Sequence, residues 1–222
     1  MTLARDIKIC GLRTLEALDA ALVNGANQIG FVFFPMSPRN ISVPLAAALC
    51  DGIDARARVV AVTVNADDRL LDEIVAQVRP DLLQLHGSET PCRVTDIKKR
   101  YKLPVVKAIS VHSRPDLQNI VPYYNIADRL LFDAKAPKGA ARPGGHGIPF
   151  DWHILDGLNK SADYMLSGGL RVDNVAEALA ITRAGGIDIS SGVERVPGVK
   201  DVCLIKAFLE VVVNICQAAT VK

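Results

Sequence analysis

Small, flexible residues follow two apolar runs near the end of the chain. Residues 164–166 are followed by Ser167-Gly168-Gly169, and residues 187–189 by Ser190-Ser191-Gly192. Glycine lets the backbone approach a bound group closely, and the amides at a helix N-terminus favour an anion. The pattern predicts a phosphate site formed by Gly168, Gly169, Ser190, Ser191 and Gly192. The alternative is that these glycines serve only tight turns.

A thiol and a carboxylate lie at the ends of two other apolar runs. Cys10 ends the run that begins at residue 7, and Asp133 directly follows residues 129–132. One acid and one base on opposite sides of a phosphosugar could isomerise it by proton transfer. A thiol acts as a base only when ionised, so the pKa of Cys10 would have to fall from an ordinary value of about 8.5. Taken singly, a cysteine is usually a small buried hydrophobe, and a carboxylate at a strand end is often a helix cap or solvated.

Two further polar residues follow apolar runs. Arg39 lies in the proline-rich turn 35–39, where its guanidinium could bind a carboxylate through two parallel hydrogen bonds or simply face solvent. His86 follows residues 82–85 and precedes Gly87. Its imidazole could contact a substrate or satisfy a loop carbonyl, so both side chains are candidate substrate-binding groups.

Eight units, each an apolar run followed by a helical pattern, account for the chain. The expected strands are residues 7–10, 28–34, 59–64, 82–85, 105–109, 129–132, 164–166 and 187–189. The expected helices are residues 14–24, 42–50, 67–78, 90–101, 116–127, 150–158, a segment that opens at 173, and 200–216. Alternating units imply a parallel sheet, and eight of them without a long insertion favour a single (β/α)8 TIM barrel of the phosphate-binding type. The absence of a Ser-, Gly- or Pro-rich linker predicts one domain over residues 1–222.

In such a barrel the C-terminal ends of the strands meet at one mouth, where barrel enzymes keep their sites. Closure puts the seventh and eighth strands between the sixth and the first. A substrate held by its phosphate over strands seven and eight would therefore have Asp133 on one side and Cys10 on the other. The loop 134–149 beside this mouth is long enough to act as a lid, or it is solvated.

Composition excludes several classes of protein. The most apolar stretch near the C-terminus, residues 207–216, is interrupted by Glu210 and Asn214, whereas a membrane span needs about 18 clean residues. The five cysteines are scattered without a CxxC pair, which predicts a reducing, cytoplasmic location and neither disulfides nor structural zinc. A net charge of +2 gives no sign of a nucleic-acid surface.

Seven motifs resemble those of the phosphoribosylanthranilate isomerases, the stand-alone barrel enzymes of tryptophan biosynthesis. They are KICGL at 8–12, GFVFFPMSPR at 30–39, QLHG at 84–87, LLFDAK at 130–135, GGHGIPFDW at 144–152, LSGGL at 166–170 and DISSGVE at 188–194. They follow one another in the family's order, and the resemblance covers residues 7 to about 208.

The resemblance implies an Amadori rearrangement of N-(5′-phosphoribosyl)anthranilate to 1-(2-carboxyphenylamino)-1-deoxyribulose 5-phosphate, with no metal or organic cofactor. By motif position, Cys10 would be the general base at C2 of the sugar and Asp133 the general acid that protonates the furanose oxygen. Arg39 would bind the anthranilate carboxylate, and the amides of Gly168-Gly169 and Ser191-Gly192 the phosphate. The expected partner is this small phosphosugar alone, for a protein that is a monomer or a homodimer.

Two positions bear on the details of the site. His146 stands where family members commonly carry another polar residue, and Arg13 follows Cys10 closely enough to lower the pKa of its thiol or to face solvent.

Three alternatives stay open. One is a Schiff-base aldolase on the same barrel, with Lys107 or Lys135 as nucleophile. Another is the related histidine-pathway isomerase, which uses two aspartates, so that a cysteine at position 10 argues against it. The third is a phosphosugar-binding protein that has lost catalysis, which would need neither Cys10 nor Asp133.

Overall fold

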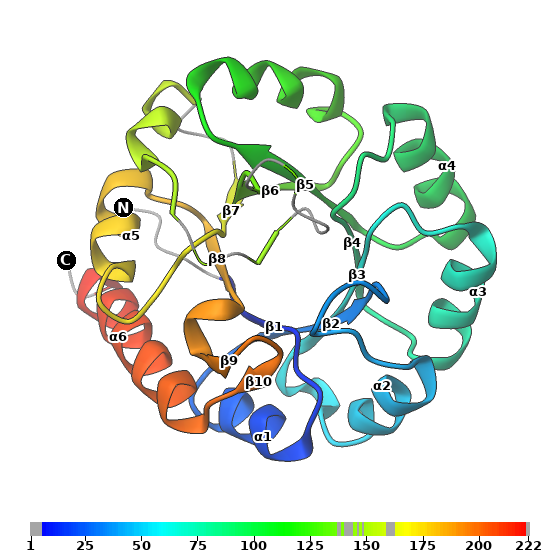
Figure 1. Ribbon diagram of the computed structural model, residues 1–222, viewed down its shortest axis with the longest axis horizontal. Coiled ribbons are helices and arrows are strands. Elements are labelled where there is room, and N and C mark those ends of the chain that lie inside the picture. The colour runs from blue at the N-terminus through cyan, green and yellow to red at the C-terminus, as the bar shows by residue number, and fades with distance from the viewer. Residues whose placement is uncertain are drawn as a thin grey trace.

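Eight parallel strands close into a barrel in the computed structural model, which describes residues 6–136, 139, 144–145, 147, 149–158 and 163–220 (Figure 1). The strands are β1 Asp6–Cys10, β2 Gln28–Phe33, β3 Arg58–Thr63, β4 Leu82–Leu85, β5 Val105–Val111, β6 Arg129–Ala134, β7 Tyr164–Leu166 and β8 Gly186–Ile189. Each pairs with the next in chain order, and β8 pairs with β1 to close the ring. The predicted (β/α)8 barrel is confirmed.

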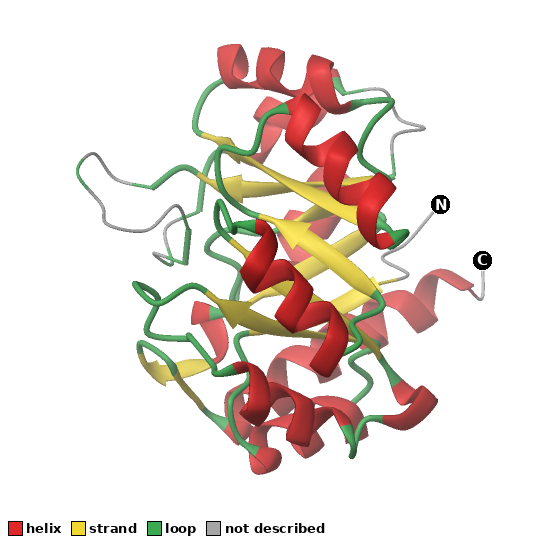
Figure 2. Cartoon of the chain, turned by 90° about the vertical axis from the view of Figure 1, so that its right-hand side faces the viewer, coloured by secondary structure: helices red, strands yellow, loops and turns green. Residues whose placement is uncertain are grey.

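Helices surround the barrel on its outside, as Figures 1 and 2 show. The α-helices are α1 Leu15–Val23, α2 Val43–Cys50, α3 Asp68–Gln77, α4 Pro91–Tyr101, α5 Val175–Thr182 and α6 Val202–Thr220. Shorter 3-10 helices are η1 Asp54–Arg56, η2 Arg114–Tyr123, η3 Trp152–Gly157 and η4 Ser191–Val193. In the described part of the chain, none of these helices has the length and apolarity that a membrane crossing needs.

Side-chain caps begin four of the α-helices where the sequence predicts them. Thr14, Ser42, Asp67 and Thr90 each accept a hydrogen bond from the amide three residues further on. Such a bond satisfies an amide that the first helical turn leaves without a partner. The capping side chain therefore both marks the start of each helix in the sequence and stabilises that start in the structure.

Several expected elements differ from the observed ones. The helix expected over 116–127 is the 3-10 helix η2, and the one over 150–158 is the 3-10 helix η3. Pro122 inside η2 has no N–H to donate, so a regular α-helix cannot continue there. The last helix begins at Val202 instead of residue 200, because β10 Val199–Lys200 pairs antiparallel with β9 Glu194–Val196.

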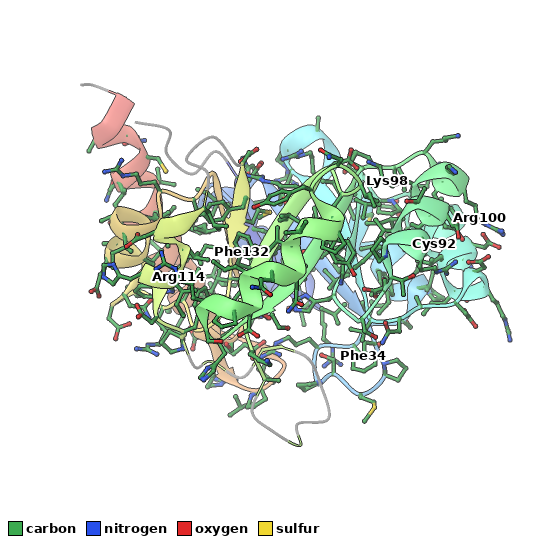
Figure 3. The ribbon with its side chains drawn as sticks, turned by 90° about the horizontal axis from the view of Figure 1, so that it is seen from above. Phe34, Cys92, Lys98, Arg100, Arg114 and Phe132 are labelled. Carbon is green, nitrogen blue, oxygen red and sulfur yellow. The ribbon has the colours of Figure 1, made fainter. Side chains whose placement is uncertain are left out.

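Two clusters of buried apolar side chains stabilise the barrel and its surrounding helices. The larger one fills the space between strands and helices, where Phe132 packs edge-on against Tyr164 with ring centroids 5.0 Å apart. Figure 3 shows Phe132 among the strands, whereas Arg100 lies on the outer face of the molecule. The smaller cluster lies inside the barrel and includes the side chain of Cys10.

Candidate active site

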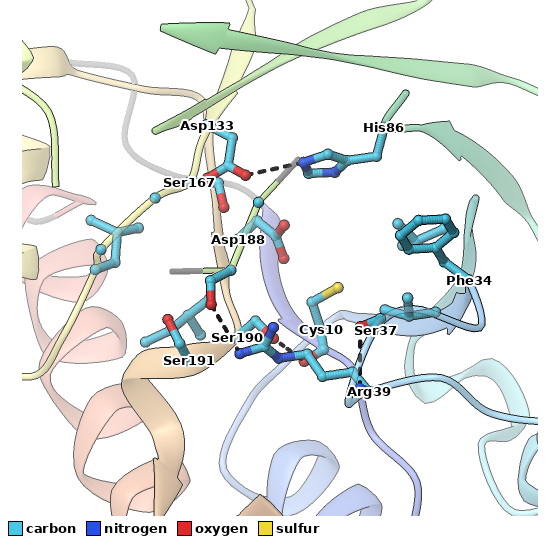
Figure 4. Close-up of a pocket in the computed structure, with 18 of the residues that line it drawn as sticks. Cys10, Phe34, Ser37, Arg39, His86, Asp133, Ser167, Asp188, Ser190 and Ser191 are labelled. Atoms are coloured by element: carbon cyan, nitrogen blue, oxygen red, sulfur yellow. Dashed lines mark hydrogen bonds and ion pairs between the residues drawn. The ribbon is translucent and has the colours of Figure 1, made fainter. Parts of the chain in front are cut away.

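A cavity that is partly open to solvent lies at the C-terminal ends of the barrel strands (Figure 4). Eight of the predicted site residues line it, namely Cys10, Arg39, His86, Asp133, Gly168, Gly169, Ser190 and Ser191. Gly192 is not among the lining residues. A Cβ at this position would lie 1.9 Å from the carbonyl oxygen of Leu170, so Gly192 allows the tips after β7 and β8 to pack together.

The last residue of β1, Cys10, presents its thiol to the cavity. Its partner across the sheet is Gly30, where a Cβ would come within 2.9 Å of the sulfur, so the glycine makes room for the thiol. Burial raises the pKa of Cys10 to about 11, and the carboxylate of Asp188 acts in the same direction. The positive charges of Lys8 and Lys200 oppose this rise without overcoming it.

The thiol is therefore protonated at neutral pH in the free protein, and the fall in pKa that general-base catalysis needs is not present in this state. Arg13 does not act on the thiol. Its guanidinium is exposed and donates to the carbonyl oxygen of Pro38 at 2.8 Å. The nearby cations that favour the thiolate are Lys8, Lys200 and Arg39.

The carboxylate of Asp133 lies inside strand β6, which runs to Ala134 and not to the expected end at residue 132. It is buried, and its Oδ1 accepts a hydrogen bond of 2.9 Å from the amide of Ala134. Its Oδ2 lies 3.0 Å from Nε2 of His86, whose Nδ1 in turn lies 3.0 Å from Nε2 of Gln84. His86 thus contacts the acid itself, a partner that neither sequence alternative included.

The guanidinium of Arg39 is buried in the wall of the cavity instead of lying on the surface. Its Nε and Nη2 donate to the two oxygens of Glu194, and Nη2 also lies 3.3 Å from the carbonyl oxygen of Gly145. Lys200 donates to Glu194 at 2.8 Å. Burial alone would raise the pKa of Glu194, but the two cations outweigh it and the pKa is lowered. Glu194 therefore stays ionised and orients Arg39.

The tip after β7 depends on backbone conformations that favour glycine. Gly168 and Gly169 have φ of +86° and +68°. A Cβ at Gly168 would lie 2.4 Å from the amide nitrogen of Ala134 and 2.9 Å from Oδ1 of Asp133. Asn174, just before α5, donates to the carbonyl oxygen of Gly169 at 3.0 Å and holds the tip in place. The glycine-rich tip that was predicted to bind phosphate thus packs directly against Asp133.

The chain is similar in sequence to proteins of a known family. A sequence model of N-(5′-phosphoribosyl)anthranilate (PRA) isomerase matches residues 7–211. The N-(5′-phosphoribosyl)anthranilate isomerase of Brucella canis is 60% identical over 212 residues, which are 96% of each chain. The chain belongs to this family.

Solved structures of family members agree with the assignment. Phosphoribosyl anthranilate isomerase from Thermotoga maritima superposes with a TM-score of 0.85 at 33% identity, covering 94% of this chain and 98% of that one. A phosphoribosyl anthranilate isomerase in complex with reduced 1-(o-carboxyphenylamino)-1-deoxyribulose 5-phosphate superposes with a TM-score of 0.80 at 30% identity, over 94% and 98% of the two chains. The predictions of this family, and of an isomerase in tryptophan biosynthesis, are confirmed.

This member of the isomerase family has cavity residues that sequence reasoning missed. They are Ser37, Gly144, Gly145, Ser167 and Asp188, together with apolar side chains. Asp188 is buried, and its Oδ2 lies 3.1 Å from Nζ of Lys8. Its Oδ1 has no hydrogen-bond partner among the described residues. The sequence does contain a signal for this ion pair, since Lys8 and Asp188 are each a charged residue within an otherwise apolar run. The two residues are direct partners where β1 pairs with β8.

Neither lysine of the aldolase alternative is among the lining residues. Nζ of Lys107 lies 2.9 Å from Glu89 and 2.7 Å from the carbonyl oxygen of Gly87, and Lys135 pairs with Asp116 at 3.2 Å. His146, where family members commonly carry another polar residue, lies outside the described residues.

Proposed function

We propose that this chain converts N-(5′-phosphoribosyl)anthranilate into 1-(2-carboxyphenylamino)-1-deoxyribulose 5-phosphate, with Asp133 as general acid and Cys10 as general base. The observation that carries the proposal is that this carboxyl group and this thiol, from β6 and β1, line one cavity together with a glycine-rich tip and a buried guanidinium. An isomerisation by proton transfer needs an acid, a base and anchors for both charged ends of the substrate.

The first step opens the sugar ring. Asp133 gives its proton to the furanose oxygen, the bond between that oxygen and C1 breaks, and the nitrogen lone pair forms a C1=N double bond. The products of this step are a positively charged iminium and an aspartate carboxylate. The carboxylate is stabilised where it forms, because the amide of Ala134 donates to Oδ1.

The second step moves the proton from C2. The thiolate of Cys10 takes it, and the electron pair of the C–H bond forms the C1=C2 double bond while the iminium nitrogen becomes neutral. The resulting enolamine becomes the ketone by gaining a proton at C1 and losing the proton of the C2 hydroxyl. Burial opposes ionisation of Cys10 in the free protein. The cationic iminium favours it, since a nearby opposite charge stabilises the ionised form.

Both ends of the substrate have a suitable anchor in this cavity. The backbone at Gly168, Gly169, Ser190 and Ser191 is proposed to bind the phosphate, with Gly192 shaping the second tip. Arg39 is proposed to bind the anthranilate carboxylate, with Glu194 fixing the plane of the guanidinium. Asp188 has a buried oxygen without a partner among the described residues, which suits a hydroxyl group of the sugar.

The wider setting follows from the same proposal. The domain is taken to extend over residues 1–222, and the reaction to proceed in the cytoplasm on a small phosphosugar, without nucleic acid or a membrane. For the oligomeric state, a monomer and a homodimer are both proposed as candidates. A relative from Thermotoga maritima is described as a dimeric phosphoribosylanthranilate isomerase of which monomers have been generated.

Turnover of N-(5′-phosphoribosyl)anthranilate, generated in situ and followed by the loss of its fluorescence, tests the proposal. Cys10→Ser and Asp133→Asn should each lower kcat by about 10²–10⁴-fold, the usual value of a general acid or base. Cys50→Ser is the matched control, because this partly buried cysteine lies on α2 outside the cavity. A folded wild type that binds a product analogue without turning substrate over would instead indicate a phosphosugar-binding protein.

A further inference from the structure

Polar side chains, all of them buried except the half-buried His86, form a continuous line from the lumen of the barrel to Asp133. Lys8 donates to Oε1 of Gln84, the amide nitrogen of Gln84 lies 3.0 Å from Nδ1 of His86, and Nε2 of His86 lies 3.0 Å from Oδ2 of Asp133. Lys8 and Gln84 have 0% and 1% of their surface exposed. Because solvent does not replace these partners, each contact has to match a donor with an acceptor.

Lys8 determines which groups donate and which accept along this line. An ammonium group carries three donors and no acceptor. The atom of Gln84 that faces it must therefore be the carbonyl oxygen, since the reversed amide would place donor against donor. The ion pair of Lys8 with Asp188 at 3.1 Å holds the ammonium group in place.

The fixed amide then decides the tautomer of His86. The NH2 group of Gln84 can only donate, so Nδ1 of His86 must accept and carries no proton. A neutral imidazole has one N–H, which consequently lies on Nε2 and points to Oδ2 of Asp133. A proton on Nδ1 instead would place one donor, the Nδ1–H, against another, the NH2 group of Gln84, and the hydrogen bond between them would be lost.

We propose that Gln84, held by Lys8, is a positioning residue that locks His86 in the Nε2–H tautomer and thereby leaves the substrate as the acceptor of the Asp133 proton. In the other tautomer, a bare Nε2 would accept the proton of Asp133 and compete with the furanose oxygen. In the locked form His86 has no acceptor site toward Asp133, and its N–H stabilises the carboxylate that forms when the ring opens. This role rests on the proposed function, in which Asp133 is the general acid.

The tautomer can be measured without any turnover. Long-range proton–nitrogen NMR spectra separate a protonated ring nitrogen from an unprotonated one, and His86→Asn identifies the signals among the four histidines. In the wild type we expect the proton on Nε2 alone. In Gln84→Glu, one carboxylate oxygen can accept from Lys8 and the other from His86, so a proton should appear on Nδ1. A proton on Nδ1 in the wild type, or none there in Gln84→Glu, would overturn the lock.

Kinetics test the consequence for the acid. Gln84→Glu and Gln84→Met should lower kcat about 10- to 100-fold with little change in KM, the same order that the loss of an outer hydrogen-bond partner costs a metal-ligating histidine. Gln28→Met is the matched control, a buried glutamine on β2 that does not line the cavity, and should keep kcat within about twofold. A changed tautomer with wild-type kcat would refute the catalytic role. A wild type without turnover would refute the proposed function, while the NMR result would still decide the lock.

Discussion

Arg39 and Glu194 form a two-point ion pair between residues 155 positions apart, with both N···O distances at 2.7 Å. The side chains are only 6% and 3% exposed. Glu194 occupies Nε and Nη2, so we expect a substrate carboxylate to approach the guanidinium through Nη1. In the proposed carboxylate site Glu194 would therefore orient Arg39, and removal of Glu194 should affect both substrate binding and folding.

Glu194→Gln should raise KM roughly 10- to 100-fold with a smaller effect on kcat, because a charge-assisted hydrogen bond is worth about 1.5–3 kcal/mol. It should also lower the free energy of unfolding by about 3 kcal/mol, since Arg39 and Lys200 would remain buried without their anion. Initial-rate kinetics and urea denaturation measure the two effects. Glu177→Gln, an exposed acid on α5, serves as control. An unchanged KM would show that Arg39 keeps its orientation without Glu194.

The contribution of Glu194 should depend on pH in a defined direction. The folded protein lowers the pKa of Glu194 below its usual 4.5, burial being outweighed by Arg39 and Lys200. A group of this kind stabilises the folded state above the unfolded pKa, and the effect is lost as pH falls through the folded pKa. The stability difference between the wild type and Glu194→Gln should therefore be constant above about pH 5.5 and shrink below pH 4.5. Urea midpoints measured from pH 3.5 to 8 test this, and a difference that grows on acidification would contradict it.

Alkylation should report the protonated state of Cys10. Burial raises the pKa of this thiol to about 11, so its reaction with iodoacetamide should be slow at pH 7 and still accelerate at pH 10. Cys92 and Cys203 are exposed and serve as internal references for accessibility. Peptide mass spectrometry after timed labelling gives the rates. A rate for Cys10 that levels off below pH 8 would mean that the free protein already holds a thiolate.

Local signals were sufficient to predict much of the fold. Strand β4 has the expected bounds, because an apolar run and the following His-Gly turn define it within a few residues. Helix α4 begins at Pro91 after the cap Thr90, as its sequence predicts. The β9–β10 hairpin escaped prediction because distant contacts define it. A Cβ at Gly198 would lie 2.3 Å from the carbonyl oxygen of Pro38, which belongs to the turn after β2.

The residues of the site also include some that local sequence signals predict and others that they do not. Cys10 and Asp133 could be predicted because each is a polar residue at or near the end of an apolar strand, and closure of the barrel brings strand ends together. Gln84 and Asp188 also lie one residue before the end of their strands, but the role of each depends on a partner on another strand. Burial of Cys10 was also invisible in the sequence, and it reverses the expected direction of its pKa.

Two glycine substitutions separate steric fit from backbone preference. Gly168→Ala adds a Cβ 2.4 Å from the amide of Ala134, beside Asp133, and also forces alanine to φ of +86°. Gly139→Ala forces alanine to a similar φ of +80°, but no atom of the described residues lies within 4 Å of the added Cβ. The control should lose about 1–2 kcal/mol of stability at most and keep its kcat. Gly168→Ala should lose more stability and most of its activity. Equal effects in thermal melts and kinetics would mean that the close packing at Gly168 has no role.

Lys107 should act as a structural cation and not as a nucleophile. It lies outside the cavity lining, and its ammonium donates to Glu89 and to the carbonyl oxygens of Leu85 and Gly87, which uses all three of its protons. Borohydride treatment in the presence of the phosphosugar should therefore give no lysine adduct by mass spectrometry.

Lys107→Met should lower the free energy of unfolding by about 3–5 kcal/mol, because the buried carboxylate of Glu89 would lose its cation. The double variant Lys107→Met/Glu89→Gln should recover part of this loss, since it removes the unpaired charge as well. A trapped adduct at Lys107 would instead assign the nitrogen a covalent role. The unfolding free energies of the single and double variants distinguish a structural cation from a nucleophile. A lysine that served only as a nucleophile would show no energetic coupling to Glu89.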